Sequence, residues 1–450
     1  MLNLITVPIP TGGALGGWRH PEAWTDTVMN LEQMISIART AERGLFDCVF
    51  FADGNGVRQM NRPELFAALT PSDRPATFEP VTLLTALAMH TSNIGLVATA
   101  TTTYEEPYLL ARKFASLDHL SKGRAGWNIV TTSTPEDSRN FGFDEHMDRD
   151  SRYGRAVEFV QVTKGLWDSW ADDAFPQNKE TGQYLDPSRV HTLNHHGKHL
   201  KIKGPLNIAR PIQGHPVLFT AGQSEDGREM AAMLADCVFA IAMTKEAGQA
   251  LMRDVKGRMA KYGRSPDHLK IIPGAGVFVG RTEEEADELY DSVAALIPPD
   301  IGVHYLSKTL VTDLSGYDID GPVPDIDASP VLGINSIRQA VADMIKAENL
   351  TIRQAYQRIV LSVNHPIFKG TVKQVADQME DWYTSGACDG FMVTPALAPS
   401  GLETFVDLVV PELQRRGLFR TEYRGRTLRE NMGLPTPANQ FFAPVMKAAE

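Results

Sequence analysis

Short, continuously apolar segments alternate along the chain with stretches of helical periodicity, and this alternation constrains the fold most strongly. The segment 47–51 (DCVFF) is too uniformly apolar for a half-exposed strand, so it is typical of a parallel strand buried on both faces. Between such segments, residues such as Leu31, Met34 and Ile35 follow the spacing of one helix face. The predicted strands are 2–7, 47–51, 94–98, 124–130, 216–219, 237–240, 270–279 and 390–393.

Eight buried strands that alternate with helices predict an α/β fold, a (β/α)8 TIM barrel. Such a barrel needs about 250 residues, whereas this chain has 450. We expect the excess as insertions at about 171–212, after the fourth strand, and about 297–369, before the eighth strand. One barrel domain is expected over residues 1–430, with a C-terminal tail over 431–450. A two-domain doubly wound fold is the alternative, disfavoured because no linker-like break separates the repeating units.

Composition narrows the class of protein. The formal net charge is −11 and the chain has no basic run, which argues against nucleic acid or an anionic membrane as a partner. No apolar run is long enough to span a bilayer, and the N-terminus lacks the pattern of a signal peptide. Three widely spaced cysteines do not form a disulfide framework. These features predict a soluble, cytoplasmic protein.

Three predicted strands begin alike: FDCVF at 46–50, ADCVF at 235–239 and ACDGF at 387–391. This weak repetition makes the cysteines small apolar strand residues and not catalytic groups or metal ligands. A histidine-rich tract spans 191–199, but its spacing matches no zinc pattern, so no metal site is expected.

In a TIM barrel the active site is built from loops that follow the strands. Asp53 follows the second predicted strand, Thr99 ends the third and Asn128 ends the fourth. Asn128 offers a donor and an acceptor together, and Asp53 must find donors or water when it leaves a buried strand. The structural alternatives are a strand-end cap for Asp53 and strand propensity for Thr99.

A second group of candidates has the chemistry of anion binding. Arg149 and Tyr153 stand at the start of a predicted helix, and an arginine fork with a tyrosine hydroxyl suits a phosphate. Ser224 precedes another helix between Gly222 and Gly227, where free amides and the helix dipole attract phosphate. The alternatives are a solvated charged helix start and an ordinary serine N-cap.

Other motifs are absent or weak. The loop 11–21 after the first strand contains His20 and either lines a substrate or is a surface loop. The glycines of 274–280 lie inside an apolar strand, so they are not a dinucleotide fingerprint. No Gly-x-Ser-x-Gly elbow is present, which counts against an α/β-hydrolase.

A set of motifs, in order along nearly the whole chain, resembles the bacterial-luciferase-like flavin monooxygenases. The similarity is greatest to the branch that contains nitrilotriacetate monooxygenase, dibenzothiophene-sulfone monooxygenase and pristinamycin synthase. The motifs are WRHP at 18–21, EPYLLARK at 106–113, LDHLSKGR at 117–124, WNIVT at 127–131, GLWDSW at 165–170, AGQS at 221–224 and GACDGF at 386–391.

The resemblance implies the oxygenase component of a two-component flavin monooxygenase. It would use reduced FMN, supplied by a separate NAD(P)H:flavin reductase, and O2 to oxidise a small organic compound through a flavin hydroperoxide. A sulfur- or nitrogen-containing substrate and a homodimer or homotetramer are implied as well. The alternatives are a deazaflavin-dependent oxidoreductase of the same fold and a non-catalytic flavin-binding protein.

The resemblance also implies roles for the candidate residues. Asp53, Thr99 and Asn128 would contact the isoalloxazine and ribityl chain, and Tyr153 and Ser224 would hold the phosphate. Many relatives have histidine at the position of Arg149. Arginine does not lose its proton near neutral pH, so Arg149 fits a phosphate ligand and not a catalytic acid. No catalytic residue is assigned; His20 and His146 are weak candidates.

Overall fold

Eight parallel strands close into a barrel, which confirms the predicted TIM-barrel fold. The computed structural model describes residues 1–60, 62–70, 73–132, 134–326, 335–362 and 364–442. The barrel strands are β1 (Asn3–Thr6), β2 (Cys48–Phe51), β3 (Gly95–Thr101), β4 (Ala125–Val130), β7 (Val217–Thr220), β8 (Cys237–Ala240), β9 (Lys270–Gly280) and β11 (Gly390–Pro395). Pairing of β9 with both β8 and β11 closes the ring.

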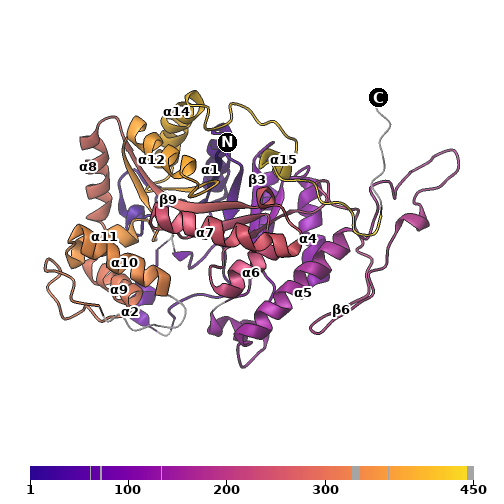
Figure 1. The fold of residues 1–450 in the computed structure, drawn as a ribbon, viewed down its shortest axis with the longest axis horizontal. Coiled ribbons are helices and arrows are strands. Elements are labelled where there is room, and N and C mark those ends of the chain that lie inside the picture. The colour runs from indigo at the N-terminus through magenta and orange to yellow at the C-terminus, as the bar shows by residue number, and fades with distance from the viewer. Residues whose placement is uncertain (61, 71–72, 133, 327–334, 363, 443–450) are drawn as a thin grey trace.

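Helices surround the barrel between its strands (Figure 1). Two of them begin with a proline, Pro80 and Pro107, whose fixed φ suits the first turn of a helix. The helices are α1 (Leu31–Arg43), α2 (Pro63–Ala67), α3 (Pro80–Ala88), α4 (Pro107–Leu120), α5 (Arg149–Trp167), α6 (Glu225–Leu234), α7 (Lys245–Arg258), α8 (Glu283–Ala294), α9 (Pro299–Leu310), α10 (Asn335–Glu348), α11 (Ile352–Val360), α12 (Val372–Thr384), α13 (Ser400–Thr404), α14 (Val410–Arg415) and α15 (Leu428–Asn431).

One strand of the main sheet was not predicted. β10 (Ile367–Thr371) pairs in parallel with the end of β9, from Gly276 to Gly280, beyond the point where β8 has left that edge. The sequence of β10, IFKGT, lacks the continuous apolar run of the other strands. This strand pairs only with the end of β9 and is not one of the eight strands of the barrel. In the first insertion, β5 (His195–His196) and β6 (Lys201–Ile202) form a short antiparallel hairpin.

Alternation along each strand separates the inside of the barrel from the helix layer. Val97 and Phe219 pack in the barrel interior, whereas their neighbours Leu96 and Leu218 pack under the helices. Successive side chains of a strand point to opposite faces, so Thr99 and Asn128 share the inward direction of Val97 and Gly126. Both candidates therefore enter the barrel at its C-terminal mouth.

The similar residues at three strand starts share a structural role. Each carries an aspartate that accepts a hydrogen bond from the second residue of a neighbouring strand: Asp47 from Leu4 N at 2.7 Å, Asp236 from Leu218 N at 2.9 Å and Asp389 from Ile271 N at 2.8 Å. Each aspartate also pairs with a cation, which is Arg420, Arg429 or Lys256 in the same order. The repeated sequence thus reflects a shared hydrogen bond, from a neighbouring strand's amide to the aspartate, that sets the register of adjacent strands. All three cysteines are free and buried.

The segments in excess of a minimal barrel lie on opposite sides of it. Figure 1 shows the β6 hairpin extending from the body at the right, and α9, α10 and α11 grouped with α2 at the lower left. The second insertion contains α9, α10 and α11, and α9 begins at Pro299 shortly after α8 ends. In the described part of the chain, no helix has the length and apolar character needed to cross a membrane.

Candidate functional site

Thr99 and Asn128 meet at the mouth of the barrel. They are opposite one another in the register of β3 and β4, and Asn128 Nδ2 donates to Thr99 Oγ1 at 2.8 Å. Thr99 Oγ1 donates in turn to the Phe51 carbonyl at 2.6 Å. Asn128 Oδ1 is buried and has no hydrogen-bond partner among the described residues. Because buried polar atoms are rarely left unpaired, this oxygen is a place for a donor on a ligand.

Tyr153 and Ser224, which are 71 positions apart in the sequence, form one corner of the mouth. The Tyr153 hydroxyl lies 3.2 Å from Ser224 Oγ. Ser224 is the N-cap of α6, as predicted, and accepts from Gly227 N at 3.2 Å. A Cβ on Gly227 would lie 2.7 Å from the backbone of Gly222, so this turn requires a glycine. The corner therefore joins two hydroxyls to exposed amides at a helix N-terminus, where an anion is favoured.

Arg149 lies beside this corner but has a partner that sequence reasoning missed. Its guanidinium forms an ion pair with Asp226, N to Oδ2 at 2.7 Å, and lies over the Tyr153 ring at 5.9 Å from the ring centre. Both charged side chains are about half exposed. The first turn of α6 thus presents a carboxylate as well as amides. No pattern in the sequence links Arg149 with Asp226, because two different helices bring them together.

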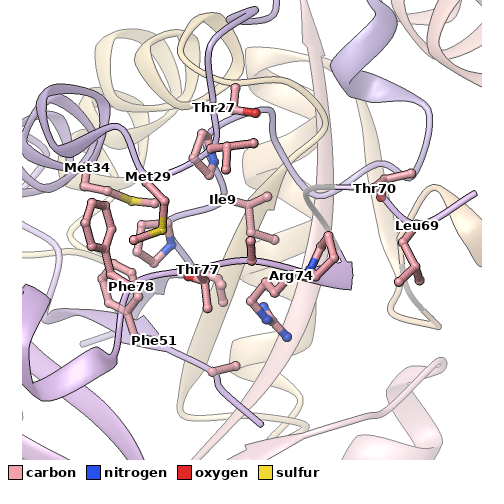
Figure 2. Close-up of a pocket in the computed structure, with 17 residues that line it drawn as sticks. Ile9, Thr27, Met29, Met34, Phe51, Leu69, Thr70, Arg74, Thr77 and Phe78 are labelled. Carbon is pink, nitrogen blue, oxygen red and sulfur yellow. The ribbon is translucent and has the colours of Figure 1, made fainter. Parts of the chain in front are cut away.

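Asp53 follows β2 and is half-buried. Burial raises the pKa of Asp53 above its ordinary value, and the Gly54 amide and the charge of Arg74 offset only part of this effect. Asp53 lies next to Ala52, which lines a cavity of about 180 Å³ that opens between the loops after β1 and β2 (Figure 2).

His146 is held between two partners at the mouth. Its Nε2 lies 3.1 Å from the Thr132 carbonyl, which can only accept, so its Nδ1 accepts from the Tyr104 hydroxyl at 2.7 Å. Tyr104 also stacks on Phe141 at 4.5 Å between ring centres. Burial first, and then the charge of Asp137, raises the pKa of Tyr104. Tyr104 was missed in the sequence, where it appears only as one aromatic residue after a run of threonines.

His20 has a local role in its loop. Its Nδ1 accepts from Glu22 N at 3.2 Å, and its neighbour Arg19 donates to the Leu296 carbonyl at 2.8 Å. The loop also packs closely on the end of β11, since a Cβ on Gly12 would lie 2.3 Å from the Ala396 oxygen. These contacts tie the loop to the start of the second insertion, and none of them joins His20 to the mouth residues described above.

The histidine-rich tract is organised by Glu158 on α5. One oxygen of Glu158 lies 2.9 Å from His195 Nε2, and the carboxylate also accepts from the amides of His199 and Leu200. Burial raises the pKa of Glu158, but these hydrogen bonds outweigh it and hold the pKa below its usual value. Within the described residues, no group of three or more potential ligands is arranged for a metal ion.

Comparison with known proteins places this chain among the luciferase-like monooxygenases. The family model described as luciferase-like monooxygenase matches residues 11–389. The chain is 47% identical to nitrilotriacetate monooxygenase component A of Aminobacter aminovorans, over 96% of each chain. It is 45% identical to N-acetyl-S-(2-succino)cysteine monooxygenase of Bacillus subtilis, again over 96% of each.

Among solved structures, riboflavin lyase with modified FMN and riboflavin is similar, with a TM-score of 0.81 and 30% identity. The match covers 97% of this chain and 96% of that one. These findings confirm the predicted family and the predicted branch.

Proposed function

Because this chain belongs to the luciferase-like monooxygenase family and is a monooxygenase that uses reduced flavin and O2, we propose that its flavin is FMN, supplied by a separate NAD(P)H:flavin reductase. The word "component" in the name of its nitrilotriacetate relative supports a second protein. The modified FMN in the riboflavin lyase structure supports the choice of flavin.

Two features of the chain fit FMN. The corner of Tyr153 and Ser224 suits a phosphate, because hydroxyl donors and free helix amides converge there. The unpaired Asn128 Oδ1 inside the barrel mouth suits a donor of the ring system or the ribityl chain. The Tyr153 and Ser224 corner is the observation that carries the choice of a phosphorylated flavin over riboflavin.

The residues of the chain bind the flavin, orient it and shield it from water. Reduced flavin supplies the two electrons with which O2 delivers one oxygen atom to the substrate and one to water. Thr99, fixed by its bond to the Phe51 carbonyl, holds the Asn128 amide and leaves the Asn128 oxygen for the flavin. Asp53, with its raised pKa, would accept or donate a hydrogen bond near the ring. Arg149 would balance the charge of the phosphate.

The oxidised atom is proposed to be sulfur or nitrogen in a small organic compound. The two relatives named above act on an amine and on a thioether, as the names of their substrates state. The loops around the barrel mouth would have to exclude water from that reaction.

The test is an assay of NADH consumption and product formation at fixed FMN, with and without a generic flavin reductase. We expect oxygen-dependent conversion of an amine or thioether only when the reductase is present, since reduced FMN diffuses between the proteins. The protein alone should not oxidise NADH. Rapid FMN-dependent NADH oxidation by this chain alone would contradict the two-component proposal.

We also propose the domain division expected from the sequence, with residues 1–430 as one barrel domain carrying insertions at about 171–212 and 297–369. The start of the 431–450 tail packs in the barrel, because Met432 and Leu434 are buried with Ile5 and Val97. Further along, the Pro437 carbonyl accepts from Arg210 at 2.8 Å. Residues 443–450 lie outside the described residues. Limited proteolysis should leave 1–430 intact within one stable fragment. A homodimer or homotetramer is proposed from the family resemblance and is measurable by light scattering.

A further inference from the structure

A mostly apolar cavity lies between the loops that follow β1 and β2. Its volume is about 180 Å³, and it is lined by Val7, Pro8, Ile9, Pro10, Thr27, Val28, Met29, Met34, Phe51, Ala52, Leu69, Thr70, Arg74, Pro75, Ala76, Thr77 and Phe78. Figure 2 shows Met29, Met34 and Phe78 grouped near Phe51 on one side, with Arg74 apart from them. Phe51 lines this cavity, and its carbonyl accepts the hydrogen bond from Thr99. The cavity therefore adjoins the proposed flavin site.

Arg74 is the one charged residue among those that line this cavity. It is half-buried, and burial is the main cause that lowers its pKa, although a guanidinium stays protonated. None of the hydrogen bonds or ion pairs formed between described residues involves Arg74. The charges of Asp53 and Asp73 act on Arg74 without a hydrogen bond or close ion pair, so an anion in the cavity would give this partly desolvated guanidinium a direct partner.

The adjacent carboxylate does not serve as that partner. Asp73 Oδ2 accepts from the amide and hydroxyl of Thr70 at 3.0 and 3.1 Å, and Asp73 Oδ1 accepts from the Tyr305 hydroxyl at 2.8 Å. Tyr305 belongs to α9, in the second insertion. The backbone of Arg74 has a φ of +52°, a left-handed conformation that arginine rarely adopts, so the fold constrains this residue. Tyr305 thus joins Asp73 to the second insertion, and Arg74 beside it forms no hydrogen bond or ion pair with a described residue.

We propose that Arg74 binds an anionic group of the substrate, a carboxylate in the simplest case, while the apolar part of the substrate lies against Met29, Met34, Phe51 and Phe78. The inference rests on the proposed oxygenase function, and it makes Arg74 a residue that sets substrate specificity. An arginine fork pairs with a carboxylate through two parallel hydrogen bonds, which favours an organic acid over its neutral ester.

The first experiment measures binding without flavin, so that it does not depend on turnover. (Benzylthio)acetate and its methyl ester are titrated calorimetrically into the flavin-free protein and into Arg74→Gln, Arg74→Lys and Arg253→Gln. Arg253, on α7, is the matched control, because it is an exposed arginine that neither lines the cavity nor is among the charges that shift the pKa of Arg74. We expect the wild type to bind the acid at least about tenfold more tightly than the ester, a preference that Arg74→Gln abolishes and Arg253→Gln keeps. Arg74→Lys should keep part of the preference for the acid over the ester.

The second experiment titrates reduced FMN under anaerobic conditions and measures conversion of the acid with a flavin reductase. Arg74→Gln should leave FMN affinity unchanged within about twofold and raise KM for the acid by about tenfold. Equal binding of acid and ester by the wild type, or no binding of either, would overturn the inference. So would a loss of FMN affinity in Arg74→Gln. If the wild type binds the acid selectively but forms no oxygenated product, the function fails while the Arg74 site stands.

Discussion

Arg149 forms an ion pair with Asp226, and this contact defines its role at the scale of a single residue. A phosphate beside Tyr153 and Ser224 would compete with Asp226 for the same guanidinium. The carboxylate also places a like charge near the anion that we propose for this corner, and like charges disfavour one another. The affinity for FMN at this site therefore depends on both members of the pair.

Two substitutions with opposite effects test the pair. Asp226→Asn should tighten the binding of reduced FMN a few-fold, because it removes the like charge and releases Arg149. Arg149→Lys should weaken binding several-fold and spare turnover at saturating FMN, because lysine keeps the charge but loses the fork. Anaerobic titration measures both. Glu225→Gln is the control in the same turn, since Arg258 already pairs with Glu225. A collapse of turnover in Arg149→Lys with unchanged FMN affinity would instead assign Arg149 a chemical role.

The strand-start aspartates act at the scale of the secondary-structure element. Asp236 accepts from Leu218 N on β7 and pairs with Arg429 on α15 at 2.8 Å. Burial raises the pKa of Asp236, but the charges of Arg429 and Lys164 outweigh this effect and hold it below its usual value. Arg429 is almost fully buried. Each such aspartate joins two neighbouring strands to a cation beyond the sheet, so it stabilises the closed ring.

Asp236→Ala should lower the free energy of unfolding by about 3–5 kcal/mol, because it leaves the buried Arg429 charge uncompensated. The double variant Asp236→Ala with Arg429→Met should lose less than the sum of the two single losses. Urea unfolding at neutral pH measures all three variants. Asp267→Ala, at an exposed turn, is the control and should change stability by less than about 0.5 kcal/mol. Additive losses in the double variant would show that the pair is not coupled.

The pH dependence of stability belongs to the whole molecule, because it sums groups in distant elements. Burial lowers the pKa of His365 from 6.5 to about 4. His215 also has a lowered pKa, chiefly through burial, although its contact with Asp168 opposes the shift. Between pH 6.5 and about 4 the unfolded chain binds a proton that the buried His365 ring refuses, so the free energy of unfolding falls as the pH falls through this window. His215 acts in the same direction.

Replacing His365 should flatten this dependence. Between pH 7 and pH 5, His365 accounts for about 2 kcal/mol of the lost stability, at 1.36 kcal/mol for each unit below its unfolded pKa. His365→Leu should therefore lose less stability than the wild type over that interval in urea unfolding. His196→Leu, at an exposed histidine of the hairpin, should keep the slope of the wild type. An unchanged slope in His365→Leu would show that His365 titrates normally.

Local patterns were sufficient to predict much of the fold and part of the site. The strands were predicted because a strand buried on both faces must be continuously apolar, whatever surrounds it. Ser224 was predicted as an N-cap because the cap depends on residues within the same turn. β10 was missed, because IFKGT becomes a strand only where the end of β9 offers it an unpaired edge.

The sequence by itself determined the barrel, the positions of the residues at its mouth and, through ordered motifs, the family. The tertiary structure alone decided which of those residues have partners. Arg149 meets Asp226 because two helices converge, and Asp73 bonds to Tyr305, from an insertion 232 positions away, and not to its neighbour Arg74. The physical reason is the sequence separation between the residues that each feature involves. Strand and helix patterns follow from the geometry of neighbouring residues, whereas hydrogen-bond and ion-pair partners are assigned only when closure of the barrel brings distant segments together.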